Sequence, residues 1–100
     1  MSRIFTKTMS PKHPSVARNY YLDATNLLDT GVTISSATVV PAPTGITVGK
    51  PVVQTPDNKV VKVLVGGGTS GETYELTFTL TLSDSEVEVA IMQIPVSLVA

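Results

Sequence analysis

The chain has 100 residues, of which 42% are hydrophobic and only 15% are charged, and its formal net charge at pH 7 is -1. The absence of cysteine excludes disulfides and thiolate metal sites, and no apolar run approaches the roughly 20 residues that a membrane helix needs. The apolar residues are mostly Val, Ile and Leu, and with abundant Thr they favour a pleated sheet. Because the first residues also lack the apolar core of a signal peptide, we expect one soluble domain made in the cytoplasm.

Residues 1–19 are predicted to form an extended arm. Up to Leu22 every charge is basic, whereas every acid follows it. The two prolines of the segment SPKHPS disfavour a helix, and the segment IFT can form a strand only by pairing with another segment. A basic arm on an acidic body suggests contact with an acidic partner, and a solvated, disordered terminus is the alternative. The residues predicted to contact the partner are Arg3, Ile4, Phe5, Lys7, Lys12 and Arg18.

From residue 20 the chain predicts short strands separated by turn residues. A first strand at residues 20–22 precedes a possible helical turn at 24–28, and further strands follow at 32–40, 46–55 and 59–65. Pro51 interrupts the segment 46–55, which predicts an edge strand or a bulged strand because proline cannot donate to a central ladder. In the segment 59–65, the alternation places Val61, Val63 and Val65 on one face and Lys62 on the other.

The strongest alternation predicts a half-buried strand at residues 72–82. Its apolar face carries Tyr74, Leu76, Phe78, Leu80 and Leu82. A polar turn then leads to a hairpin partner at residues 86–99. In this partner, apolar residues change parity after Ile91, which predicts a β-bulge there. Alternatively, both faces of this segment are covered because another subunit packs on it. The residues then predicted for self-association are Met92, Ile94, Val96 and Leu98.

These segments together predict an all-β fold. About seven strands over residues 20–100 fit an immunoglobulin-like antiparallel β-sandwich, preceded by the extended N-terminal arm at residues 1–19.

The glycine-rich loop Gly66–Thr73 has the outline of a phosphate-binding loop, G-x-x-x-x-G-K-[ST]. However, Glu72 stands where the lysine belongs, and a strand follows where a phosphate loop needs a helix. Strands on both sides suggest a hairpin-like context. We therefore interpret the loop as a turn that uses glycine for its positive φ angles.

No catalytic, metal or cofactor site is predicted. The only histidine, His13, lies in the arm without an orienting partner, so a Ser-His-Asp triad has no basis. Asp84, Glu86 and Glu88 could ligate calcium but do not form a complete ligand set, and the two glutamates are expected on the solvated face of a hairpin. Four basic arm residues could contact phosphates, but the acidic body and scarce aromatics argue against nucleic-acid binding. We expect a protein that is not an enzyme.

Three segments resemble a family of small tailed-phage virion proteins with an immunoglobulin-like β-fold, over about residues 20–98. The matching positions are Tyr20, Asp23, Leu28, Gly31, Thr33, Ile34, Ser36, Gly45–Val48, Gly67, Gly68, Thr69, Gly71, Thr73 and Tyr74. Val32 replaces the usual aspartate, and Val39 or Val40 replaces an aromatic residue. The arm is not part of the shared pattern, so the resemblance does not identify its partner.

The resemblance implies a structural role in the virion, without chemistry and without a cofactor. The leading hypothesis is a capsid decoration or cement protein, which would bind the major capsid protein or other virion proteins and form homo-oligomers. In this hypothesis the arm reaches across neighbouring subunits. The alternatives are a neck or tail-fibre attachment protein and, from another class, a surface carbohydrate-binding module. No membrane or nucleic-acid partner is expected.

Overall fold

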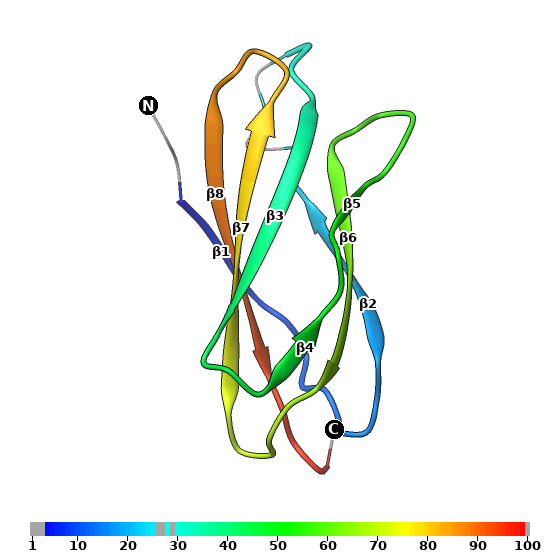
Figure 1. Cartoon of the computed structure of the whole chain (residues 1–100), viewed down its shortest axis with the longest axis vertical. Helices are drawn as coiled ribbons and strands as arrows, with labels where there is room; N and C mark the ends of the chain where they lie inside the picture. The colour runs from blue at the N-terminus through cyan, green and yellow to red at the C-terminus, as the bar shows by residue number, and fades with distance from the viewer. Residues whose placement is uncertain (1–3, 26–27, 29, 100) are drawn as a thin grey trace.

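The computed structural model describes residues 4–25, 28 and 30–99, and these residues form eight β-strands (Figure 1). The strands are β1 (Ile4–Thr8), β2 (Arg18–Asp23), β3 (Ile34–Ala42), β4 (Ile46–Val48), β5 (Val52–Val53), β6 (Val60–Gly67), β7 (Thr73–Leu82) and β8 (Val87–Pro95). In this described part of the chain, no helix has the length and hydrophobicity to cross a membrane.

The strands form two sheets that face each other. One sheet has the order β1-β8-β7-β3 and the other has the order β2-β6-β4, with β5 also paired to β6. β1 runs parallel to β8, and the other pairs are antiparallel. When β2, β3, β4, β6, β7 and β8 are lettered B to G, the sheets read B-E-D and G-F-C, which is the strand order of immunoglobulin domains. The predicted all-β sandwich is confirmed.

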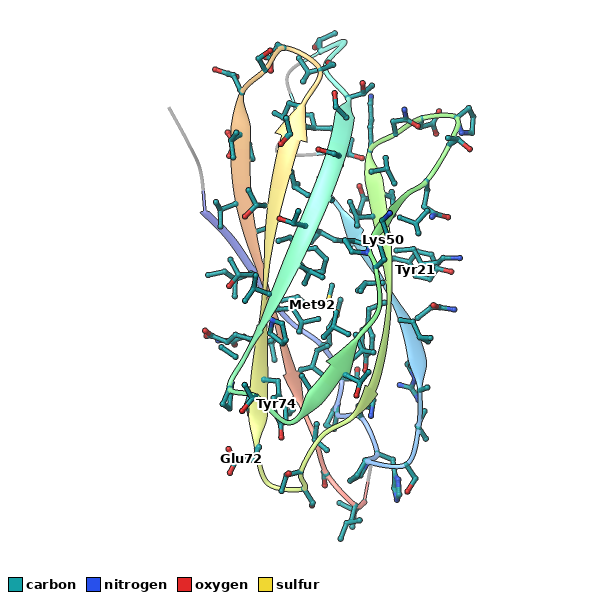
Figure 2. All side chains as sticks on the ribbon, in the orientation of Figure 1. Tyr21, Lys50, Glu72, Tyr74 and Met92 are labelled. Carbon is teal, nitrogen blue, oxygen red and sulfur yellow. The ribbon has the colours of Figure 1, made fainter. Side chains whose placement is uncertain are left out.

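Alternate side chains of the facing strands fill the space between the sheets. The apolar face predicted for β7 is buried over its whole length, and Tyr74 and Phe78 are at most 1% exposed. Val61, Val63 and Val65 of β6 face it from the other sheet, as their alternation predicts. In Figure 2, Tyr74 and Met92 lie between the sheets, whereas Tyr21 points outward. Each fully buried side chain of this kind stabilises the fold by about 1.5–3 kcal/mol.

The bulge predicted near Ile91 is wrong. β8 pairs with β7 without a register shift, from Pro95 opposite Thr73 to Val87 opposite Thr81. The buried face of β8 consists of its even-numbered residues and continues past the strand's end, namely Glu88, Ala90, Met92, Ile94 and Val96. Because the apolar residues among them pack into the core, every even-numbered residue of β8 points inward, and Glu88 therefore lies on the buried face as well. The shift in register lies in β3 instead, at Ile34 to Ser36.

Two segments of the structure differ in detail from the prediction. The strand expected at residues 46–55 is two strands, β4 and β5, which both pair with β6 and are separated by Gly49, Lys50 and Pro51. The turn expected at residues 24–28 shows one backbone hydrogen bond, from the Leu28 N–H to the Thr25 carbonyl at 3.3 Å. Residues 26 and 27 of this turn lie outside the described residues.

The glycine-rich loop turns the chain from one sheet to the other. The predicted turn is confirmed, but it is not hairpin-like, because β6 and β7 lie in different sheets. The Thr69 N–H donates to the hydroxyl of Tyr74, at 2.9 Å, across five residues of the loop. A tyrosine near the start of strand F that bonds the backbone upstream is the tyrosine corner of immunoglobulin-type sandwiches. Gly68 has φ +99° and lies directly over Tyr74 and Val96.

Replacing Tyr74 by Phe should lower the free energy of unfolding by about 1 kcal/mol, because the Thr69 N–H loses its acceptor while the ring still fills the core. Urea unfolding measures the change. Tyr21→Phe is the matched control, since that side chain is 53% exposed, and its effect should stay within about 0.5 kcal/mol. Equal losses for the two variants would show that the hydroxyl of Tyr74 has no special role.

Replacing Gly68 by Ala should be more harmful than replacing Gly71 by Ala, although both glycines have positive φ angles, +99° and +91°. A Cβ at Gly68 would lie 2.9 Å from Val96 Cγ2 and 3.4 Å from Tyr74 Cε1, whereas one at Gly71 would meet nothing within 4 Å. We expect a loss of about 1–2 kcal/mol from backbone strain at Gly71 and about 1–3 kcal/mol more from overpacking at Gly68. Thermal unfolding of both variants checks this order, and the reverse order would contradict it.

Candidate functional site

The described part of the predicted arm lies along β8 of its own chain. β1 pairs with β8 from Ile4 opposite Val89 to Thr8 opposite Gln93. The pairing continues beyond β1, because the Met9 N–H donates to the Gln93 carbonyl at 2.8 Å. These contacts supply the strand partner that the segment IFT needs. They bring the arm onto the sandwich and leave the other edge of β1 without a strand neighbour among the described residues.

Lys12 holds the end of this segment in the sandwich. Its N–H donates to the Pro95 carbonyl and its carbonyl accepts from the Ser97 N–H, at 2.8 and 2.9 Å. The side chain is fully buried, and Nζ donates to the carbonyls of Gly67 and His13 at 2.7 and 2.9 Å. Burial lowers the pKa of Lys12, and the nearby Arg18 charge lowers it further. The expectation that Lys12 contacts a partner is therefore corrected, because its ammonium group is bonded inside its own chain.

The other predicted contact residues of the arm are not buried in the way that Lys12 is, or their side chains are not described. Arg3 lies outside the described residues, and Ile4, Phe5 and Lys7 belong to β1. Arg18 is exposed at the start of β2. It lies near Tyr20, whose pKa is raised by burial, and the guanidinium opposes that rise. Contact of Ile4, Phe5, Lys7 and Arg18 with a partner stays a prediction.

The C-terminal segment predicted for self-association mostly serves the core. Met92, Ile94 and Val96 are at most 2% exposed and pack between the sheets of their own chain. The sequence reveals their apolar parity but not which partner covers it, and the second sheet is that partner. Leu98 differs, because it is 65% exposed beyond the end of β8. Self-association therefore stays a prediction for Leu98 alone.

Acidic and histidine side chains are dispersed. Among the described residues, no three His, Asp or Glu side chains come close enough to hold a metal ion. Glu88 is only 6% exposed, which corrects its expected place beside Glu86 on a solvated face. His13 Nδ1 accepts a hydrogen bond from the Ser15 N–H at 3.0 Å, so it shapes a local turn.

An apolar and aromatic surface lies on the outer face of the second sheet. Tyr21 of β2 and Val52 of β5 both pair with Lys62 of β6, and Leu64 follows on the same face of β6. Tyr21, Val52 and Leu64 are 53%, 49% and 49% exposed. We call these four residues the Tyr21 surface. Tyrosine is enriched at protein–protein interfaces, and the stem of Lys62 adds apolar area between the other three side chains.

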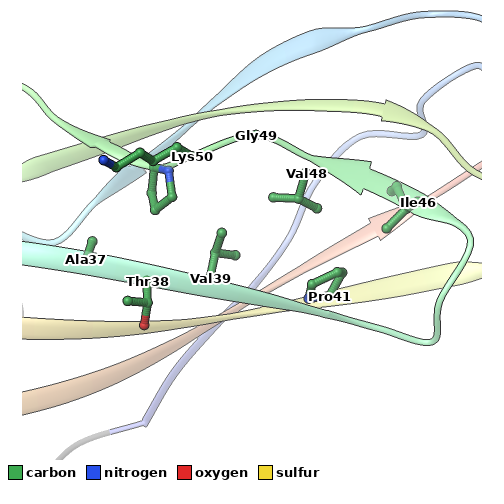
Figure 3. A pocket seen from close by; sticks show the side chains of 9 residues that line it. Ala37, Thr38, Val39, Pro41, Ile46, Val48, Gly49 and Lys50 are labelled. Carbon is green, nitrogen blue, oxygen red and sulfur yellow. The ribbon is translucent and has the colours of Figure 1, made fainter.

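A groove lies between β3 and β4, where the two sheets leave their edges open. Its volume is about 520 Å³. The lining residues are Ala37, Thr38, Val39, Pro41, Ile46, Val48, Gly49, Lys50 and Pro51. Figure 3 shows Val39 of β3 pointing across the groove toward the strand that carries Val48. Lys50 contributes the only charge among these lining residues.

Sequence reasoning missed both surfaces, although it contained a signal for each. Tyr21 has the opposite parity to Tyr20 and Leu22, which places it on the outer face once the two are assigned to the core. Pro51 indicated an edge strand, but the strand facing that edge was unknown. Of the three tyrosines only Tyr21 is exposed, so an aromatic platform for a carbohydrate is not formed by tyrosines.

Replacing Lys12 by Met should lower the free energy of unfolding by about 1–3 kcal/mol, because two carbonyls lose charge-assisted hydrogen bonds. Chemical unfolding measures this loss, and Lys50→Met is the control because Lys50 is exposed. Equal stability of the two variants would mean that the ammonium group of Lys12 does not hold the segment.

Comparison with known proteins identifies the chain. No curated protein matches it. A family described as podophage GP4 fiber-tail adaptor protein gp77 matches residues 12–95. The match begins at the buried Lys12 and ends with β8, so it spans strands β2 to β8 and the end of the predicted arm but not β1. The predicted membership of the small tailed-phage virion proteins is confirmed. The chain belongs to the podophage GP4 fiber-tail adaptor protein gp77 family and is a structural protein of the virion.

Proposed function

We propose that the protein is a non-enzymatic adaptor that joins a fibre to the tail of a podophage virion. The family match over residues 12–95 carries this proposal. Of the virion positions considered from the sequence, the match favours attachment at the neck or tail over decoration of the head shell. The expected partners are therefore a fibre protein and a tail protein instead of the major capsid protein.

The shape of the molecule supports an adaptor. It measures 42 × 26 × 19 Å, and its strands run along the long axis (Figure 1). An adaptor must hold two proteins at the same time, so it needs two separate contact surfaces. The described residues offer the Tyr21 surface on the outer face of one sheet and the groove between β3 and β4 at the sheet edges. Neither surface needs a cofactor.

The Tyr21 surface fits a folded partner. Tyrosine offers a large contact area at a low loss of side-chain entropy, and it is enriched where interfaces concentrate their binding energy. Lys62 can extend its apolar stem beneath the partner and keep its charge at the rim. The arm residues Ile4, Phe5, Lys7 and Arg18 are proposed as further contacts. Leu98, exposed at the end of the sandwich, is proposed for self-association.

The number of copies per virion tests this function. An adaptor at a symmetric tail should be present in about a dozen copies or fewer and should remain on isolated tails, because closed rings contain few subunits. Quantitative mass spectrometry of purified virions, isolated heads and isolated tails measures both properties, with the major capsid protein as the internal standard. Hundreds of copies on isolated heads would contradict the adaptor and restore the decoration hypothesis.

A further inference from the structure

The groove between β3 and β4 is bounded by two open strand edges. β3 pairs with β7 on one side and with no strand on the other, and β4 likewise pairs only with β6, within the described residues. An open edge presents a row of unpaired backbone N–H and C=O groups. The hydrogen bonds of the neighbouring strands determine which of these groups are free.

The backbone bonds of β7 identify the free groups of β3. The Ser83 N–H donates to the Thr33 carbonyl, so the odd-numbered residues at this end of β7 direct their backbone groups toward β3. They pair with even-numbered residues of β3, such as Thr79 with Thr38. In an antiparallel pair the alternate residues point the other way, so Ala37 and Val39 direct their N–H and C=O groups into the open edge. Pro41 has the same parity, and its missing N–H is tolerated because it faces no strand.

The backbone bonds of β4 give the same result on the opposite wall. The Gly49 N–H donates to the Leu64 carbonyl at 2.8 Å, so the odd-numbered residues of this segment face β6. Ile46 and Val48 then direct their backbone groups away from β6, to the free edge of β4. The groove is therefore an apolar seam bounded by two strand edges that have no strand neighbour among the described residues.

The fold explains why this seam is open. Larger immunoglobulin domains add further strands beside strand C, which is β3 here. This chain instead passes from β3 to β4 through Pro43, Thr44 and Gly45, and so crosses directly to the other sheet. No segment of the described chain occupies the position beside β3.

We propose that an extended segment of a partner virion protein binds in this groove and adds a strand to the free edge of β3. The backbone groups of Ala37 and Val39 pair with this segment, and the walls receive its alternate side chains, which is the β-augmentation mode of peptide recognition. The inference rests on the proposed function only for the class of partner, which is another protein of the virion.

The lining of the groove specifies the chemistry of the segment. Small and medium apolar residues surround it, so the inward side chains of the segment are small or medium and apolar. Lys50 is the only charged lining residue, which favours an acidic residue where the segment passes it. A second copy fits less well. Two β3 edges paired about a two-fold axis would bring two Lys50 side chains to one seam, and each Pro41 would lack a donor.

Hydrogen exchange of the full-length protein, free and in purified virions, tests the proposal directly. In the free protein the amides of Ala37 and Val39 should exchange quickly, whereas those of Thr38 and Val40, which are bonded to β7, exchange slowly and serve as internal controls. In virions the amides of Ala37 and Val39 should exchange at least about tenfold more slowly. Fragmentation at residue resolution after quenching provides the rates.

Variants supplied in trans to a phage that lacks the gene isolate the contacts. Val39→Pro removes a backbone donor of the free edge. Val39→Ala is its matched control, because it also loses the valine side chain but keeps the backbone N–H. Occupancy in virions should be about tenfold lower for Val39→Pro than for Val39→Ala. Lys50→Glu should lower occupancy about fivefold, whereas Lys59→Glu, outside the groove, should not.

Three results would overturn the proposal. The first is unchanged hydrogen exchange of the Ala37 and Val39 amides in virions. The second is equal occupancy of the two Val39 variants in virions, when unfolding measurements show that both variants are folded. The third is protection of these amides in the isolated protein that rises with its concentration, which would assign the edge to a second copy. Copy number and location in the same virions report on the adaptor function separately. A few copies on tails with an exposed edge would leave the adaptor intact and reject the added strand.

Discussion

The packing of Tyr74 against the glycine-rich loop, together with the hydrogen bond from the Thr69 N–H to its hydroxyl, constrains the crossing between the two sheets on which the sandwich depends. The hydrogen bond joins the glycine-rich loop to the first buried residue of the longest strand, at 2.9 Å. Gly68 approaches Tyr74 and Val96 too closely for a larger residue, and the ammonium group of Lys12 bonds the carbonyl of Gly67. The loop, the linker after β1 and the end of β8 therefore meet at one end of the molecule.

Two candidate surfaces for binding other proteins lie on the sides of the sandwich. The core side chains are committed to packing, and the described residues bring no metal cluster together. Two exposed surfaces of the described residues on these sides are the Tyr21 surface and the open seam between β3 and β4. A rigid two-sheet body with aromatic, apolar and backbone contacts on its sides suits a protein that positions other proteins, since rigid elements hold binding groups more accurately than loops.

The sequence predicted what depends on local patterns. The period of two in β7 and the odd-numbered valines of β6 identified their buried faces, and the glycines identified the turn before Tyr74. It could not predict features that depend on the partner strand. The parity change at Ile91 suggested a bulge, yet the second sheet covers one continuous face of β8, and the outer face is simply half-buried. Lys12 resembled an exposed arm residue because its two acceptors, one of them 55 residues away, are invisible in the sequence. The groove could not be predicted, because it lies between the edge strands of two different sheets and only the sheet topology places them side by side.

Family membership makes the protein a structural component of the virion, and the open edge offers a physical form for the attachment proposed at the tail. The adaptor role and the added strand do not depend on each other, but one measurement observes both. Single-particle cryo-electron microscopy of the virion tail at side-chain resolution tests them most directly. The account predicts the sandwich between tail and fibre densities, with an extended segment of another chain running beside Ala37 and Val39 of β3. A sandwich found on the head shell, or one at the tail whose β3 edge faces only solvent, would contradict it.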